Sequence, residues 1–161
     1  MIHYRGMKYQ TTLITDAARR ERMTQRILIP FDGSEPAWTA LKDAVEQYSD
    51  AEIIVLYALQ LNQFDFGTEG TGTDDLPDVS QNYAEELMTE AKRFGSQHGV
   101  TLTTTIETGP PDRVIVDYAE KHNIDQIVIG SHGRSGISRI LLGSVAEKVA
   151  RRSSVSVTLV R

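Results

Sequence analysis

The chain of 161 residues contains no cysteine. This absence excludes disulfide bonds, cysteine-ligated zinc or iron–sulfur sites and a thiol nucleophile, and it fits the reducing cytoplasm. Long apolar runs are absent as well, because no segment approaches the roughly 20 consecutive apolar residues that a membrane-spanning helix needs. The sequence therefore predicts a cytoplasmic protein without membrane-spanning helices.

Positive charge is scarce outside the N-terminal segment. The net charge is −5, and residues 1–26 contain six basic and two acidic residues, so residues 27–161 carry a net charge of −9. Because an acidic body repels phosphates, we expect no nucleic-acid partner. We interpret residues 1–25 as a basic, flexible N-terminal extension. It lacks the apolar stretch of about 7–15 residues that is typical of a signal peptide.

Several well-known site motifs are missing. The sequence has no G-x-x-x-x-G-K-[ST] motif and no G-x-G-x-x-G motif at a predicted strand end, so a phosphate site here must be of another kind. The four histidines, at positions 3, 98, 122 and 132, do not have the spacing of metal ligands. We therefore expect no metal site built from histidines.

From residue 26 onward, short apolar runs alternate with segments that have apolar residues at helical spacing. The apolar runs at 27–31, 53–59, 100–107, 127–129 and 155–159 predict five strands, and the segments between them predict four helices. The acidic, glycine-rich residues 60–78 are predicted to form a loop. This alternation predicts one α/β domain over residues 26–161, a doubly wound parallel sheet with helices on both faces. We take 3-2-1-4-5 as the hypothesis for its strand order.

Two of the predicted strands end in unusual loops. Asp32-Gly33-Ser34 follows the first strand, and the glycine- and serine-rich residues 130–136 follow the fourth strand. In the order 3-2-1-4-5 these two strands are neighbours where the strand order reverses, which is where such sheets bind ligands. We therefore expect both loops to open into one crevice.

The second loop has features of an anion site. Its glycines let backbone N–H groups approach a ligand closely, and the helix predicted to begin at Gly143-Ser144 favours an anion at its N-terminus. Arg134 could offset phosphate charge. The alternative interpretation is an ordinary connecting loop, in which Ser144 and Glu147 form a capping box.

Other constellations carry less weight. Asp32, Ser131 and His132 have the residue types of a hydrolytic triad, but the sequence contains no G-x-S-x-G nucleophile elbow. No convincing general base or arginine finger lies beside the loop, so an enzymatic role ranks second. We expect Trp38, in the first predicted helix, to pack in the core.

Three segments carry a resemblance to a known family. Gly130-x2-Gly133-x9-Gly143-Ser144, after a buried strand and before a terminal helix and strand, resembles the signature of the universal stress protein family. The segments Ile-Leu-Ile-Pro-Phe-Asp-Gly-Ser at 27–34 and Ile-Val-Leu-Tyr-Ala at 54–58 are also similar to its pattern. The resemblance covers residues 26–161. A departure is the proline usual before the final strand, which is absent from Ser153-Ser154-Val155.

The resemblance implies a Rossmann-like fold, the ATP-binding branch of that family and a regulatory role in the stress response. It implies ATP, or AMP or ADP, as the bound nucleotide, with a Mg²⁺ ion accompanying the phosphates. The alternatives are a slow ATPase or nucleotidyl-transfer enzyme, and an interaction domain that binds no nucleotide. The expected nucleotide-binding residues are Pro30, Asp32, Ala58, Ile129, Gly130, Gly133, Arg134, Gly143, Ser144 and Val145.

The final strand is predicted to be an edge of the sheet, with unpaired backbone groups that another chain can bind. The segment from Ser154 to Val160 contains no proline, lysine or other charged residue. Alternation predicts that Val155, Val157 and Leu159 face the core together. We therefore expect a homodimer through Val155 to Val160, a mode that the family resemblance also implies. The alternative is an edge covered by the N-terminal extension.

Overall fold

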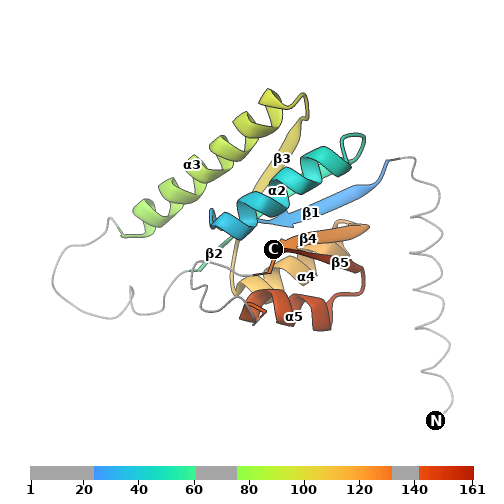
Figure 1. Ribbon diagram of the computed structural model, residues 1–161. Coiled ribbons are helices and arrows are strands. Elements are labelled where there is room, and N and C mark those ends of the chain that lie inside the picture. Colours follow the sequence, from blue (N-terminus) through green and yellow to red (C-terminus); the bar gives the residue numbers. More distant parts are fainter. Residues whose placement is uncertain (1–23, 61–75, 132–141) are drawn as a thin grey trace, which may run out of the picture.

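The computed structural model describes residues 24–60, 76–131 and 142–161. Its five strands are β1 (Arg26–Pro30), β2 (Glu52–Leu59), β3 (Leu102–Thr108), β4 (Gln126–Gly130) and β5 (Ser156–Val160). They form one parallel sheet in the order β3-β2-β1-β4-β5 (Figure 1). The predicted doubly wound fold and strand order are confirmed.

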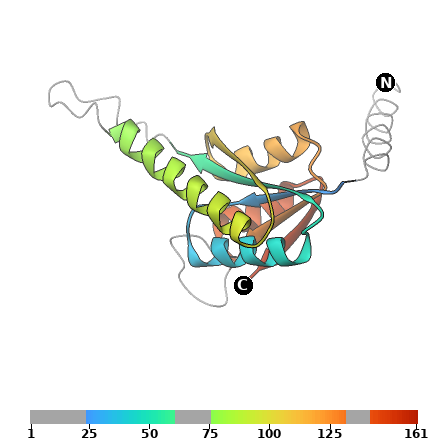
Figure 2. The same cartoon turned by 90° about the horizontal axis from the view of Figure 1, so that it is seen from above.

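Four helices connect the strands and cover both faces of the sheet: α2 (Glu35–Gln47), α3 (Leu76–Gln97), α4 (Pro111–Lys121) and α5 (Ser144–Arg152). Helices α2 and α3 lie on one face, and α4 and α5 lie on the other (Figures 1 and 2). Successive residues of a strand point to opposite faces. In β1, Ile27 and Ile29 accordingly pack under α2 and α3, whereas Leu28 packs under α4 and α5. A central strand buried on both faces must be apolar throughout, which explains the continuous apolar run at 27–31.

The turn after β1 leads directly into helix α2. The Ser34 side chain accepts a hydrogen bond from the Ala37 N–H at 3.4 Å, and Pro36 lies in the first turn of the helix, where its missing N–H has no cost. Trp38 packs edge-on against Phe31 and Phe94, with ring centroids 4.8 and 5.9 Å apart. The prediction that Trp38 is a packing residue is confirmed.

Two predicted boundaries were wrong. Helix α3 already begins at Leu76, so the loop predicted for residues 60–78 ends earlier, because a proline such as Pro77 is tolerated in the first turn of a helix. Strand β3 begins at Leu102 rather than at residue 100. The reason is that the Val100 N–H bonds to the Gly95 carbonyl at 2.9 Å and thereby closes the end of α3.

The predicted core face of the last strand is wrong in its second half. Val155 is buried and Val157 is half-buried, but Leu159 is 42% exposed and Val160 is only 8% exposed. Val160 packs in the layer beneath α2, whereas Val155 and Val157 pack in the layer of α4 and α5. At an edge strand, the position of the covering helices rather than alternation alone decides which residues are buried. No helix in the described ranges has the length and apolarity needed to cross a membrane.

Candidate functional site

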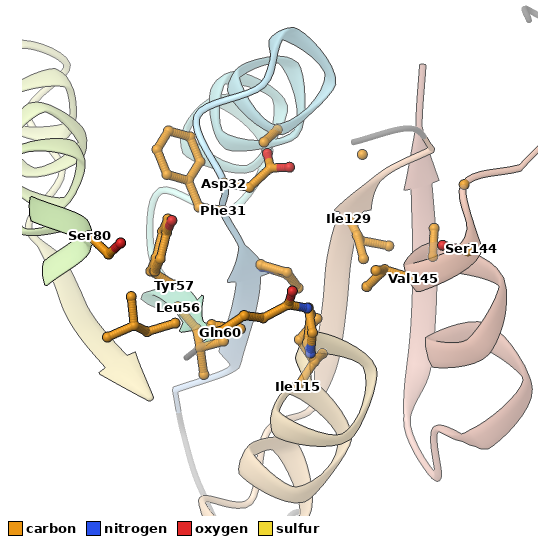
Figure 3. A pocket seen from close by; sticks show the side chains of 18 residues that line it. Phe31, Asp32, Leu56, Tyr57, Gln60, Ser80, Ile115, Ile129, Ser144 and Val145 are labelled. Carbon is orange, nitrogen blue, oxygen red and sulfur yellow. The ribbon is translucent and has the colours of Figure 1, made fainter. Parts of the chain in front are cut away.

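A pocket of about 510 Å³ lies at the carboxyl ends of the strands, where β1 and β4 are neighbours and the strand order reverses (Figure 3). Residues from β1, β2, β4 and all four helices line it. Its volume is within the range of about 300–1,000 Å³ that is typical of small-molecule sites. The crevice expected from the strand order is therefore present.

Eight of the ten expected nucleotide-binding residues come together at this pocket. They are Pro30, Asp32, Ala58, Ile129, Gly130, Gly143, Ser144 and Val145. The other two, Gly133 and Arg134, lie outside the described residues. The eight come from four separate parts of the chain, because the parallel crossovers return every strand end to the same edge of the sheet.

Asp32 both shapes the turn after β1 and lines the pocket. Its Oδ1 accepts a hydrogen bond from the Ser34 N–H at 3.0 Å. The next residue, Gly33, has a φ of +79°, a conformation that other residues adopt only with strain. The carboxylate is half-buried at the pocket wall between Phe31 and Ile129 (Figure 3). Asp32 can therefore accept hydrogen bonds from a ligand while it stabilises the start of α2.

Backbone hydrogen bonds anchor both ends of the segment between β4 and α5. The Gly143 N–H donates to the Ser131 carbonyl, and the Ser131 N–H donates to the Val160 carbonyl, both at 2.7 Å. Ser131 is only 3% exposed, so it lies below the surface of the pocket and not in the open position of a nucleophile. These bonds hold the N-terminus of α5 at the ends of β4 and β5.

The predicted capping box at α5 is not formed. Gly143 is the N-cap residue, without a side-chain cap, and Ser144 is the first residue of the helix. The Glu147 side chain forms an ion pair with Arg151 at 3.0 Å. Ser144 therefore remains exposed at the pocket wall beside Val145 (Figure 3). The first N–H groups of a helix have no partner within the helix, so this end favours an anion.

Gly130 has a packing role that sequence reasoning missed. A Cβ at this position would lie 2.7 Å from the backbone carbon and oxygen of Pro36. The first turn of α2 can approach the end of β4 this closely only because residue 130 has no side chain. Gly130 thus determines how the two neighbouring strand ends meet.

Much of the rest of the pocket wall is apolar or aromatic and was not predicted. Leu56 and Tyr57 line it from β2, and Ile115 lines it from α4 (Figure 3). Two polar residues also line it: Ser80 of α3, and Gln60, which directly follows β2. The start of α4 could have been anticipated, because a helix that follows a parallel strand begins at the same edge. The same rule applies to Ser80, which lies near the start of α3 after β2.

The arrangement suits a ligand with an apolar planar part and an anionic part. Apolar side chains from β2, β4, α4 and α5 surround one side of the pocket, and the N-terminus of α5 and Asp32 supply polar groups on another. In the described part of the chain, no group of three or more His, Asp or Glu residues could hold a metal ion.

Comparison with protein-family models gives one match, the Universal stress protein family, over residues 23–161. Universal stress protein MJ0531 of Methanocaldococcus jannaschii is 33% identical over 144 residues, which cover 88% of this chain and 84% of that protein. Universal stress protein MJ0577 of the same organism is 30% identical over 155 residues, which cover 86% of this chain and 96% of that protein.

Solved structures of similar proteins have the same fold. The structure of protein MJ0577 matches with a TM-score of 0.72 at 30% identity and covers 86% of this chain and 96% of its own. A universal stress protein solved in complex with cAMP matches with a TM-score of 0.66 at 27% identity and covers 87% of this chain and 99% of its own.

Proposed function

The chain belongs to the universal stress protein family, and we propose that it binds an adenine nucleotide in the pocket beside β1 and β4. In this proposal it acts as a nucleotide-responsive regulatory module in the stress response. The observation that carries the proposal is the convergence of Asp32, an apolar compartment and the N-terminus of α5 on one pocket. The relative that was solved with cAMP supports the adenine nucleotide as the ligand class.

The proposed roles follow from the chemistry of each lining residue. Pro30, Ile129 and Val145 offer apolar surface to the base, and the backbone of Ala58 lies at the same wall. The Asp32 carboxylate accepts hydrogen bonds from ribose hydroxyl groups. The phosphates lie at Gly143 and Ser144, where the helix end provides backbone N–H donors. Gly130 contacts the nucleoside, and Gly133 and Arg134 remain predictions for the phosphate end.

The proposal also covers which nucleotide binds, where in the cell the protein is located and whether it forms a dimer. We propose ATP as the principal ligand, with Mg²⁺ bound by the phosphate oxygens, and a cytoplasmic location. We also propose a homodimer that pairs through Val155 to Val160. The exposed Leu159 on this edge strand supports the last point, because an apolar residue on an open edge is a contact surface for another chain.

The experiment is isothermal titration of the full chain with ATP, ADP, AMP and cAMP, with and without Mg²⁺, followed by a single-turnover hydrolysis assay. Saturable binding at one site per chain with slow or no hydrolysis supports the regulatory module. Rapid turnover of bound ATP would instead support the enzyme. Absence of binding by every adenine nucleotide would overturn the proposal and leave the interaction domain.

A further inference from the structure

Gln60 is the first residue after β2, and it lines the pocket. Its side chain extends from the end of the strand across the pocket toward Ile115 of α4 (Figure 3). In the described part of the chain, the Gln60 carboxamide makes no hydrogen bond with another residue. It therefore presents both an N–H donor and a carbonyl acceptor to whatever occupies the pocket.

The Gln60 carboxamide lies at a part of the pocket that apolar side chains also line. Leu56 and Ile115, which line the pocket with it, are apolar. The other polar groups on the lining side chains are the Tyr57 hydroxyl on β2, Asp32 and Ser144 toward β1 and α5, and Ser80 toward α3 (Figure 3). An apolar compartment holds a planar ring but does not identify it, because identification needs precisely placed polar groups. Among the described lining residues, Gln60 is the one whose side chain carries both an N–H donor and a carbonyl acceptor.

We propose that Gln60 determines the base specificity of the pocket by pairing with the N6–N7 edge of adenine. The inference rests on the proposed function and extends it to the choice of base. On this edge adenine presents the N6 amino donor beside the N7 acceptor, which matches the acceptor and donor of a carboxamide. Guanine presents two acceptors, O6 and N7, on the same edge. A carboxamide therefore makes two hydrogen bonds with adenine and only one with guanine.

The test compares the wild-type chain with Gln60→Ala and Gln60→Glu in titrations with AMP, GMP and 7-deaza-AMP, which lacks the N7 acceptor. Glutamate is nearly isosteric with glutamine but cannot donate to N7 when ionised. Gln47→Ala is the matched control, because Gln47 is an exposed glutamine at the end of α2 and does not line the pocket. Melting curves of all variants verify that each one is folded.

We expect the wild-type chain to prefer AMP over GMP and to lose about 2- to 12-fold in affinity for 7-deaza-AMP, the range for one neutral hydrogen bond. Gln60→Ala and Gln60→Glu should each weaken AMP binding by about tenfold and show no further loss with 7-deaza-AMP. Gln47→Ala should match the wild-type chain. Such non-additivity between a ligand atom and a side chain identifies a direct contact.

Two different failures are distinguishable. If the Gln60 variants keep the wild-type ratio of AMP to GMP affinity and the wild-type penalty for 7-deaza-AMP, the assignment of Gln60 is overturned, while AMP binding by the wild-type chain still supports the proposed function. If the wild-type chain binds none of the three nucleotides, the proposed function itself is overturned, and the assignment of Gln60 with it.

Discussion

Three glycines around the pocket illustrate how one residue type serves three physical purposes. Gly33 adopts a φ of +79° in the turn after β1. Gly130 gives room to the backbone of Pro36. Gly143 has an ordinary extended conformation, with φ −61° and ψ 146°, so the backbone does not require glycine there. The proposed function gives the glycine at 143 a role in ligand access, which a substitution can test.

The Gly143→Val variant should stay folded and lose nucleotide binding. Valine adopts the observed backbone angles, and a poorer N-cap costs about 1 kcal/mol of stability. Its branched side chain would occupy the space through which a phosphate approaches the start of α5. Titration with ATP together with a melting curve measures both effects. Wild-type ATP affinity in a folded Gly143→Val variant would contradict the phosphate assignment.

Replacing Asp32 separates its structural role from its proposed binding role. Asp32→Ala should weaken nucleotide binding by about 1.5–3 kcal/mol, the contribution of a hydrogen bond to a charged group. The same change removes the bond to the Ser34 N–H and so also lowers the melting temperature. Asp32→Asn is the control, because its amide oxygen can retain that bond without the charge. A lower melting temperature with unchanged affinity in Asp32→Ala would leave Asp32 a purely structural residue.

At the scale of the elements, close packing of neighbouring helices and strand ends positions the walls of the pocket. Helix α2 rests on the end of β4 through the contact of Pro36 with Gly130. Helices α4 and α5 are joined by an ion pair between Asp112 and Arg152, with Nη1 and Oδ2 2.7 Å apart. An Asp near a helix start can act as the N-cap, but Pro110 is the N-cap of α4 and Asp112 lies inside the first turn. Its carboxylate serves the contact between the helices instead.

The Gly130→Ala variant should be destabilised by about 1–3 kcal/mol, the usual cost of overpacking. The added Cβ would lie 2.7 Å from backbone atoms of Pro36, and backbone cannot move aside as a flexible side chain can. Urea denaturation measures the free energy of unfolding. Gly143→Ala serves as the comparison, since its backbone angles are ordinary. Equal stability of the two variants would show that α2 shifts without cost.

The Arg152→Ala variant should lose about 1–3 kcal/mol of stability, because it leaves the Asp112 carboxylate, only 12% exposed, without its partner. Arg151→Ala is the matched control. Arg151 is 75% exposed and pairs with Glu147 one helical turn away, an interaction that contributes less than about 0.5 kcal/mol. Urea denaturation of both variants gives the difference. A larger loss for Arg151→Ala would contradict the importance of the contact between the helices.

At the scale of the whole molecule, β3 and β5 are the two edge strands of the sheet that the described residues form. Leu159 on β5 and Leu142 before α5 are exposed by 42% and 36%. The structure also refines which residues can test the proposed dimer. Val160 is buried, so a charge there would unfold the edge and not merely separate two chains. Ser156 and Thr158 are exposed on the same strand.

Lysine at both Ser156 and Thr158 should weaken the homodimer by about tenfold, because like charges directly opposite one another destabilise a pair of strands. Sedimentation over a range of concentrations measures the dimer affinity. Lysine at both Gln47 and Gln97 adds the same charge at exposed positions at the ends of α2 and α3. A monomeric full chain and a monomeric chain that begins at Met23 would together contradict the dimer. A dimer seen only without residues 1–22 would show that they cover the edge.

The sequence by itself determined the elements and the doubly wound, parallel class of the sheet. The unbroken apolar run at 27–31 identified a strand buried on both faces. The alternation of strands and helices implied right-handed crossovers between parallel strands. Parallel strands place Asp32 and Gly143 at the same edge of the sheet, the edge formed by the carboxyl ends of the strands. The family motif reached the same residues, since the spacing of glycines along the chain is a property of the sequence alone.

Only the tertiary structure decided which surfaces meet. The closeness of Gly130 to Pro36, the burial of Val160 in place of Leu159 and the position of Gln60 across from Ile115 each depend on where a neighbouring element lies. Sequence periodicity predicts which face of a helix or strand is apolar, but it does not predict which other element covers that face. Packing between elements distant in the sequence supplies this information, and it therefore decides the walls of the pocket and the open edge of the sheet.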